Sequence, residues 1–173
     1  MKRQFLFVVL AFILAASPAF VKAQSWKIGE GYSVKFEAGD PSGEFTGLKG
    51  TIVFDEKNLA SAKFDVSIDV ASINTGNGMK NTHAKGANWF DAEKFPTINF
   101  ISSAISKTAD GYEAKGTLEM HGVKKDFTMP FTFTNNTFTS SFDVNRLDFN
   151  LDDGKHPKMS PTMKVMLNVP VTK

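Results

Sequence analysis

Residues 74–100, NTGNGMKNTHAKGANWFDAEKFPTINF, form the stretch that decides the fold. This stretch interrupts a series of segments in which apolar and polar side chains alternate, and it does not alternate in the same way. One alternating segment ends before it at Val70, and the next begins at Thr97. An insertion of this kind in an antiparallel sheet usually lies across one end of the sheet. We therefore predict that it forms a lid.

The insertion contains one predicted short helix, residues 79–85. Asn77 has the side-chain oxygen that a helix N-cap requires, and Gly86 can end the helix. A helix of this length is too short to be stable alone. We expect Trp89 and Phe90 to hold it by packing against the sheet.

The segments around the insertion are predicted strands. In residues 62–70, Phe64, Val66 and Ile68 face one way while charged and hydroxyl side chains face the other. This alternation is typical of an antiparallel sheet with one buried face. The same pattern predicts eight strands at even spacing, over residues 25–36, 45–54, 62–70, 98–107, 112–120, 125–133, 138–144 and 163–171.

Turn residues separate these strands. Asn, Asp and Gly tolerate the positive backbone φ of tight hairpin turns better than other residues do. Gly47 and Gly50 fall inside the predicted strand 45–54 and indicate a bend or bulge that would help a barrel to close. Two-residue hairpin turns are predicted at Asp110-Gly111, His121-Gly122 and Asn135-Asn136.

The strand pattern predicts an all-β fold. Strands and helices do not alternate as they do in a parallel sheet, so the choice lies between a closed antiparallel barrel and a two-sheet sandwich. The periodicity leaves both open. An eight-stranded barrel is just wide enough to be filled by its own side chains or to hold one small ligand.

The N-terminus has the pattern of a cleaved signal peptide. Lys2 and Arg3 precede an uncharged apolar run over residues 5–16, which is shorter than the roughly 20 residues that span a membrane. We predict cleavage before Gln24, which leaves residues 24–173 as a single domain. Three of the 20 basic residues lie in the leader, so the domain has 17 basic against 18 acidic residues, a net charge of −1. This balance excludes the basic surface that nucleic acid requires.

Four segments resemble the YceI-like family of exported lipocalin-like proteins. They are GLKGTIVFDEKN, FDVSIDVASINTGNGMKNTHAKGANWFDAEKFPTINF, GTLEMHGVKKDFTMPFTF and NRLDFNL, in the family's order. The resemblance implies an elongated eight-stranded antiparallel barrel with the helix over one end. It also implies a tunnel for a polyisoprenoid, such as an isoprenoid quinone, or for a fatty acid or its amide. It further implies a periplasmic or secreted protein that is not an enzyme and has no cofactor.

Several positions depart from the family's pattern. Lys80-Asn81 stands where the family usually has Arg-Asp, and Asn150 stands where a glycine often follows Asp-Phe. The segment VKFEAGDPSGEFTG is compact and has no His, and residues 152–161 match nothing in the family. These changes fall in loops and at the expected rim, so they affect the predicted head-group site more than the fold.

The alternation and the resemblance together predict the binding residues. Small residues at Ala114 and Gly116 are expected to leave room inside the barrel. Lid and rim residues are predicted at His83, Trp89, Phe90 and Arg146; Arg146 either bonds a ligand at the tunnel mouth or pairs with a carboxylate such as Asp148. The predicted interior set is Val34, Phe36, Ile52, Phe54, Phe64, Val66, Ile68, Phe100, Leu118, Met120, Phe127, Met129, Phe131, Phe142, Val165 and Leu167.

Catalytic and metal sites are not predicted. The spacing of His83, His121 and His156 makes no metal site, and the chain has neither Cys nor a G-x-S-x-G nucleophile motif. The preferred hypothesis is a non-catalytic carrier or sequestering protein for a long apolar molecule. The alternative is an interaction module with a filled core that acts on a membrane redox or stress-response partner. A homodimer and a transient membrane contact are left open.

Overall fold

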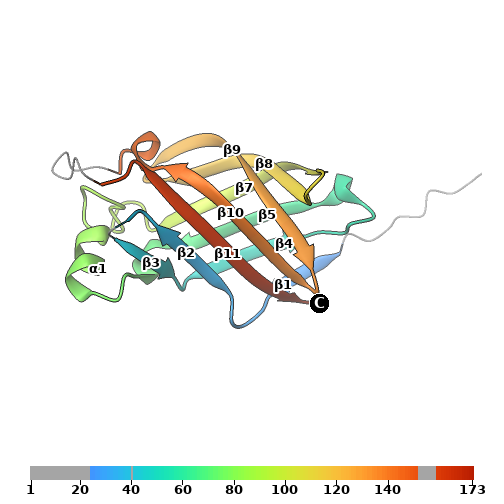
Figure 1. Ribbon diagram of the computed structural model, residues 1–173, viewed down its shortest axis with the longest axis horizontal. Helices are drawn as coiled ribbons and strands as arrows, with labels where there is room; N and C mark the ends of the chain where they lie inside the picture. The colour runs from blue at the N-terminus through green and yellow to red at the C-terminus, as the bar shows by residue number, and fades with distance from the viewer. Residues whose placement is uncertain (1–23, 40, 152–158) are drawn as a thin grey trace, which may run out of the picture.

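The computed structural model describes residues 24–39, 41–151 and 159–173 (Figure 1). The predicted signal peptide lies outside the described residues. Within the described residues, the one α-helix, α1 (Gly78–Lys85), lies at one end of an elongated β structure. The strands are β1 (Ser25–Ile28), β2 (Ser33–Glu37), β3 (Ser42–Phe45), β4 (Leu48–Val53), β5 (Lys63–Asp69), β6 (Ile73–Asn74), β7 (Thr97–Lys107), β8 (Tyr112–Met120), β9 (Val123–Thr134), β10 (Thr137–Asn145) and β11 (Thr162–Thr172).

The sheet closes into a barrel of eight antiparallel strand positions. Neighbouring strands follow the order β1-β4-β5-β7-β8-β9-β10-β11, and β11 pairs back with β1 at Thr172–Lys27 and Val171–Ile28. β2 pairs with β11, β3 with β2, and β6 with β3, so these short strands extend the first three positions. The predicted eight-stranded barrel is confirmed, and the two-sheet sandwich is wrong, because a closed ring has no free edge strands.

Each of the first three strand positions is broken in two, so the strand predicted over 25–36 is not continuous, and the break in the strand predicted over 45–54 falls at Thr46 and Gly47, where a bend is predicted. The breaks separate β1 from β2, β3 from β4, and β5 from β6. Side-chain hydroxyls form hydrogen bonds between the residues at these breaks. The Tyr32 hydroxyl donates to the Thr46 carbonyl and accepts from the Leu48 N–H at 3.1 Å, while Ser72 Oγ accepts from the Gly47 N–H at 2.9 Å. These hydroxyls replace ladder hydrogen bonds, so the wall can bend here without leaving polar groups unsatisfied.

Two of the three predicted hairpin turns are confirmed. His121 and Gly122 have φ of 52° and 74°, and Asn135 and Asn136 have φ of 51° and 55°, as a two-residue turn with positive φ at both positions requires. The third prediction is wrong in length. β7 ends at Lys107 and β8 begins at Tyr112, so the connection has four residues, and the Thr108 N–H donates to the Gly111 carbonyl at 2.9 Å.

The helix α1 is held by its caps and by the chain that follows it. Asn77 Oδ1 accepts from two N–H groups of the first turn, as predicted, and Gly86 ends the helix in an extended conformation. None of the helix residues is buried, whereas Trp89 and Phe90 are. The Phe90 N–H donates to the Ala84 carbonyl at 3.0 Å, which fixes this buried pair to the helix.

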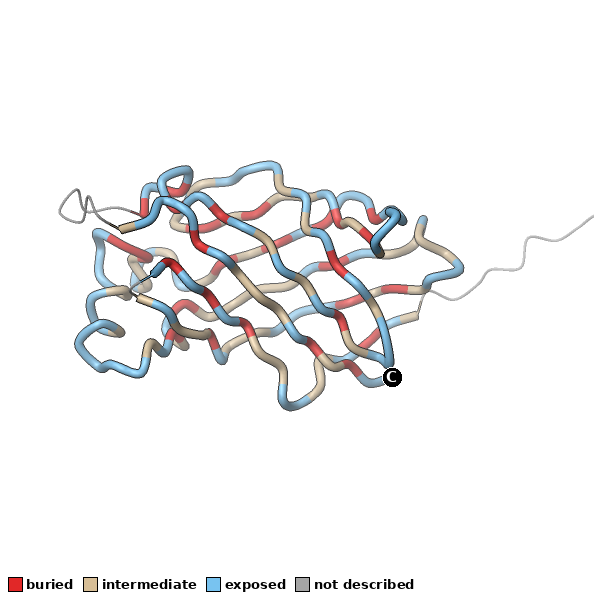
Figure 2. Tube along the Cα trace, viewed as in Figure 1, coloured by how far each residue is buried: buried red, intermediate tan, exposed pale blue. Residues whose placement is uncertain are grey.

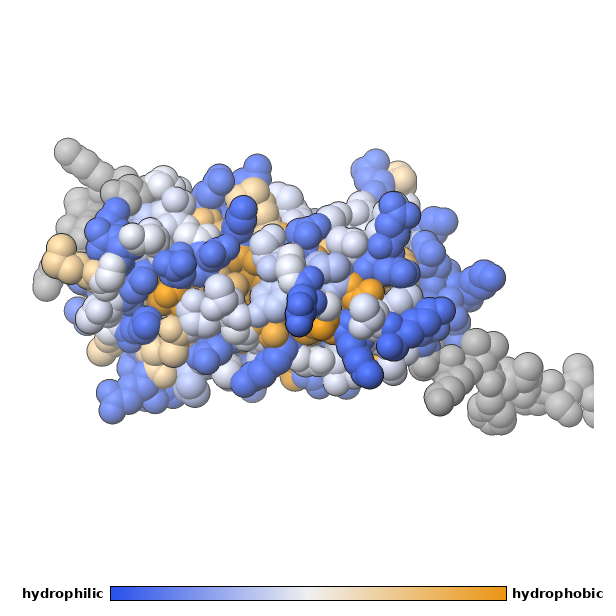
Figure 3. All heavy atoms as spheres, turned by 90° about the horizontal axis from the view of Figure 1, so that it is seen from below, coloured by the Kyte–Doolittle hydropathy of each residue, from blue (hydrophilic) through white to orange (hydrophobic). Residues whose placement is uncertain are grey.

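The two ends of the barrel are packed differently. Opposite α1, beside the C-terminus, the fully buried Phe54 contacts the rings of Tyr112, Phe131, Phe133 and Phe138 at centroid distances of 5.1–5.5 Å. This aromatic cluster plugs that end. Along the strands, buried and exposed residues alternate (Figure 2), and hydrophilic side chains cover most of the surface in Figure 3, with apolar atoms between them. The space for a ligand therefore lies between the aromatic cluster and α1.

Candidate ligand-binding cavity

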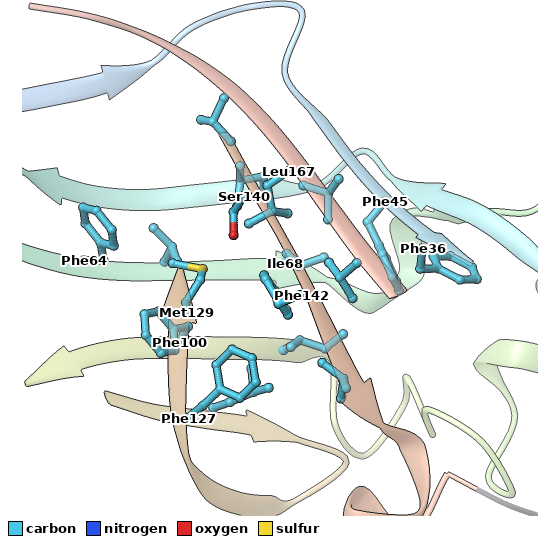
Figure 4. Close-up of a pocket in the computed structure, with 18 of the residues that line it drawn as sticks. Phe36, Phe45, Phe64, Ile68, Phe100, Phe127, Met129, Ser140, Phe142 and Leu167 are labelled. Carbon is cyan, nitrogen blue, oxygen red and sulfur yellow. The ribbon is translucent and has the colours of Figure 1, made fainter. Parts of the chain in front are cut away.

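Inward side chains enclose a cavity of about 150 Å³ inside the barrel. Fifteen of the sixteen predicted interior residues line it, whereas Phe54 lies in the aromatic cluster at the closed end and is not part of this lining. Figure 4 shows Phe64 near one side of this lining and Phe36 near the other, with Phe100, Phe127 and Met129 between them. Several of these side chains are only half-buried. The position of the predicted residues around one cavity follows from the strand alternation.

The cavity wall is almost entirely apolar. Lys35, Thr139 and Ser140 are the only residues with polar side chains in its lining. The Ser140 hydroxyl donates to the Pro130 carbonyl, so its hydrogen-bonding capacity is used within the wall. An apolar cavity of this volume stays dry and binds small apolar groups. The inner cavity is therefore suited to a hydrocarbon group and not to a polar substrate.

The sequence reasoning missed part of the lining. Phe45 was read as the start of a strand without an inward role, and Phe90 was assigned only to the lid. Phe138 follows the alternation of its strand and could have been included from the same pattern. The further apolar lining residues outside the predicted set are Phe45, Leu48, Phe90, Ile98, Phe138, Val144, Met163 and Val169.

The small residues on β8 do not create this space, contrary to the prediction. Ala114 is fully buried and lies outside the cavity lining, as does Gly116. A Cβ on Gly116 would lie 2.2 Å from the Ile101 carbonyl oxygen, beside the irregular register of β7 between Ser102 and Ala104. Gly116 is therefore required by a close approach between two strands.

A second, wider cavity of about 930 Å³ lies under α1. It is lined by Lys80 and His83 from the helix, by Trp89, and by Arg146 from the late turn η3 (Arg146–Phe149). Phe36, Phe90 and Met163 line both cavities and so form the partition between them. The barrel thus offers a narrow apolar inner space and a wider outer space with polar and cationic groups.

The structure places Arg146 at the rim, where it lines the outer cavity, and shows backbone contacts that the sequence did not predict. Its side chain is buried, and it donates from Nε to the Ser160 carbonyl at 3.0 Å and from Nη1 to the Leu151 carbonyl at 2.6 Å. Its guanidinium also lies 5.8 Å from the centre of the Trp89 ring. These contacts anchor the late loop to the lid. The suggested ion pair with Asp148 is not among the ion pairs of the described residues.

The other predicted rim residues lie where expected. His83 is on the exposed side of α1 and lines the outer cavity, with its ring 6.0 Å from that of Trp89. Trp89 and Phe90 are buried beneath the helix. His121 is a turn residue, as predicted, and its Nδ1 lies 3.1 Å from the Phe149 carbonyl oxygen.

Titratable groups with shifted pKa values lie away from both cavities. The Tyr112 hydroxyl donates to Glu56 at 2.7 Å, and this hydrogen bond, with burial and the charge of Glu56, raises the pKa of Tyr112. Hydrogen bonds from Lys115 and Ser106 lower the pKa of Glu113 on the barrel surface. The described residues contain no group of three or more side chains suited to a metal ion; Asp152, Asp153 and His156 lie outside them.

Comparison with known proteins agrees with this geometry. Residues 22–171 match the YceI-like domain. The chain belongs to the YceI-like family. A UPF0312 protein of Yersinia pestis (strain Pestoides F) is 34% identical over 92 residues, which are 53% of this chain and 48% of the relative. The matched part of the chain therefore spans about half the length of the curated relatives it matches.

Solved structures share the barrel. The crystal structure of Burkholderia cenocepacia BcnA superposes with a TM-score of 0.73 at 27% identity and covers 86% of this chain and 96% of that chain. A polyisoprenoid binding domain from Saccharophagus degradans, implicated in plant cell wall breakdown, superposes with a TM-score of 0.59 at 13% identity and covers 86% of this chain and 97% of that chain. At this identity the second likeness shows the fold alone.

Two departures from the YceI-like pattern have local explanations. Asn150 ends η3 with φ of 56°, a conformation that glycine adopts freely and asparagine tolerates. Asn81 Oδ1 accepts hydrogen bonds from the Thr75 N–H and hydroxyl at 2.8 and 2.7 Å, which ties α1 to the end of β6.

Among the described residues, no helix has the length and apolarity needed to cross a membrane.

Proposed function

We propose that this protein carries or sequesters a long, slender apolar molecule of the polyisoprenoid or isoprenoid-quinone class, without catalysing a reaction on it. The observation that carries the proposal is the inner cavity, whose wall is almost entirely apolar and which adjoins a wider cavity with cationic groups at one end. The apolar tail would occupy the inner cavity, and the head would remain in the outer cavity. A fatty acid or its amide also has an apolar tail and a polar head, and would bind in the same way.

The cavity volumes restrict the shape of the ligand. About 150 Å³ holds an apolar group of benzene size, so the inner cavity in this conformation takes only a short part of an apolar chain. The outer cavity of about 930 Å³ has room for a larger head. Met120 and Met129 in the inner wall are flexible, and such side chains adapt to chains of different shape.

Burial of the tail supplies the affinity. Each buried methylene contributes about 0.8 kcal/mol, so even five methylenes supply roughly 4 kcal/mol before the cost of ordering the chain. Such binding has little dependence on the identity of the tail. The fit of the chain to the inner cavity would select its thickness, and the groups around the outer cavity would select the head.

Family and fold support the proposal at a coarser level. The chain belongs to the YceI-like family, and one structure with the same fold is described as a polyisoprenoid binding domain. We further propose that residues 1–23 are a cleaved signal peptide, that residues 24–173 form one domain, and that the protein acts in the periplasm or outside the cell. Transient contact with a membrane would let the ligand transfer.

Native mass spectrometry of the protein purified from a periplasmic extract tests the function. A mass increment that resolves to a polyprenyl species or a quinone is the expected result. A protein mass without any increment, together with no binding of added geranylgeraniol, would overturn the carrier function and favour the filled-core interaction module. The same spectra report the mass of the mature chain, and so test cleavage before Gln24.

A matched pair of variants links the bound mass to the inner cavity. Leu167 lines the cavity, and the adjacent Asn168 is exposed on the outside of the same strand. Leu167→Trp should fill part of the cavity and reduce the fraction of protein that carries ligand. Asn168→Trp should leave that fraction unchanged. Equal ligand content in both variants would place the ligand elsewhere.

A further inference from the structure

The barrel wall is incomplete between β9 and β10. β8 pairs with β9 from Tyr112–Phe131 to Met120–Val123, and β10 pairs with β11 along its whole length. β9 and β10, in contrast, form only three residue pairs, the last of which is Thr132–Thr139. Figure 1 shows the two strands meeting at their hairpin beside the C-terminus and diverging toward the α1 end. Both strands are fully described, so this seam is a feature of the fold.

The local sequence explains why the pairing stops there. Pro130 lies two residues from Thr132, the last paired residue of β9, and has no N–H to donate to a neighbouring strand. Its carbonyl accepts from the Ser140 side-chain hydroxyl, so a side-chain hydrogen bond joins the two strands just beyond the ladder. From this point toward α1, the antiparallel register does not join the backbone edges of the two strands.

The seam is bounded at its other end. His121, in the turn before β9, lies with Nδ1 3.1 Å from the Phe149 carbonyl oxygen in η3 after β10. The Phe95 ring packs against His121 at a centroid distance of 5.1 Å. The open stretch therefore has a hydrogen-bonded boundary at each end, with the Pro130–Ser140 contact at one and the His121–Phe149 contact at the other.

Aromatic side chains close the seam from inside. Phe127 on β9 and Phe142 on β10 meet edge to face at a centroid distance of 5.1 Å, and both are only half-buried. Both line the inner cavity, as do Thr139 and Ser140 at the point where the strands separate. The cavity thus reaches the seam, and side chains alone stand between it and the outside along this stretch.

We propose that the seam between β9 and β10 is a side entrance through which the apolar chain enters and leaves the inner cavity, with Phe127 and Phe142 as its movable closure. The inference rests on the proposed function and adds the route of exchange. An apolar chain is the class of ligand that fits, because the closing side chains and the space behind them are apolar. Sideways entry would let a chain move directly from a lipid surface into the cavity.

The other routes are more obstructed. The aromatic cluster around Phe54 plugs the end beside the C-terminus. At the α1 end, a chain must pass lengthwise between Phe36, Phe90 and Met163. β1 and β4 also form only two residue pairs, beside a surface pocket of about 530 Å³, but there the Tyr32 hydroxyl holds the strands by hydrogen bonds to Thr46 and Leu48. Most of the remaining wall is held by paired ladders, whose hydrogen bonds would have to break for it to open. At the seam, rotation of two side chains is sufficient, and rotamer changes of this kind are fast compared with backbone rearrangement.

A cross-link over the seam tests the entrance. Continuing the β9–β10 register would place Thr128 opposite Asp143, and both side chains are exposed. The natural chain has no Cys, so bismaleimides of graded length would react only with the pair Thr128→Cys and Asp143→Cys. The matched control is Lys115→Cys with Thr128→Cys, which joins two exposed residues already paired between β8 and β9. Loading and release of cis-parinaric acid are followed by stopped-flow fluorescence.

The seam cross-link should slow both loading and release by about tenfold or more, which lies within the range over which association rates vary among variants of one site. The dissociation constant should stay unchanged because a closed entrance affects both directions equally. The control cross-link should change neither rate. Phe142→Ala, without any cross-link, should speed both. Unchanged rates in the seam-linked protein would overturn the entrance while leaving the carrier function intact, whereas failure of the parent to take up the probe would count against both.

Discussion

Phe64→Asp tests the register of the whole barrel wall. Phe64 is 5% exposed and lies 5.1 Å from the ring of Phe131 and 5.5 Å from that of Phe138. Loss of a buried phenylalanine ring costs roughly 3–5 kcal/mol. A buried carboxyl without a partner adds about 1–3 kcal/mol even when it is neutral. The sum of roughly 4–8 kcal/mol is comparable to the whole unfolding free energy of a typical domain, which is about 5–15 kcal/mol.

The assay is thermal and urea unfolding followed by circular dichroism. For a domain of this size, each kcal/mol lowers the melting temperature by about 2–4 °C, so we expect Phe64→Asp to lower it by roughly 8–30 °C or to abolish folding. Phe64→Leu removes about three carbons and should cost roughly 2 kcal/mol. Lys63→Asp places the same carboxyl on the exposed face one residue away and should change stability by about 0.5 kcal/mol or less.

The pH dependence of the same variant separates the charge from the lost ring. Burial raises the pKa of a carboxyl, so the folded variant binds its proton more tightly than the unfolded chain does. The variant should therefore regain part of its stability as the pH falls toward the ordinary carboxyl range. A cost below about 2 kcal/mol would refute the reasoning, because only a carboxyl that reaches water escapes the burial penalty. The inner cavity would then be wet.

Three further predictions concern stability. Arg146→Met should cost about 2–4 kcal/mol in urea unfolding, because it leaves buried carbonyls of the late loop without their donor; no change would mean that this loop is held by other contacts. Because the pKa of Tyr112 is raised in the folded protein, its contribution to stability is complete below the ordinary pKa of 10.0 and is lost as the pH rises through the raised pKa. Tyr112→Phe should remove this loss of stability at alkaline pH. An unaltered dependence of stability on pH would contradict the role given to the Tyr112–Glu56 hydrogen bond. Asn136→Gly should stabilise the hairpin by a few tenths to about 1 kcal/mol, because φ is 55° there; a lower melting temperature would contradict this.

Local patterns predicted most of the wall. Alternation along each strand depends only on neighbouring residues, so the inward set could be chosen before the strand partners were known, and all its members except Phe54 line the cavity. The turn residues at His121-Gly122 and Asn135-Asn136 and the cap at Asn77 were predictable for the same reason. The predictions for Ala114 and Gly116 failed because residue size alone does not show whether a small residue faces a cavity or a neighbouring backbone.

The sequence by itself determined the eight strand positions, the face of each strand that turns inward, and the inserted helix with its caps, because these follow from periodicity and backbone preference within a few residues. Only the tertiary structure decided that β1 pairs with β11 and that Tyr32 and Ser72 form hydrogen bonds at the strand breaks. It also decided that Arg146 anchors the late loop and that a seam lies open beside Phe127 and Phe142. Those features join residues distant in the chain. Their energies depend on strand register and side-chain packing, which no single segment encodes.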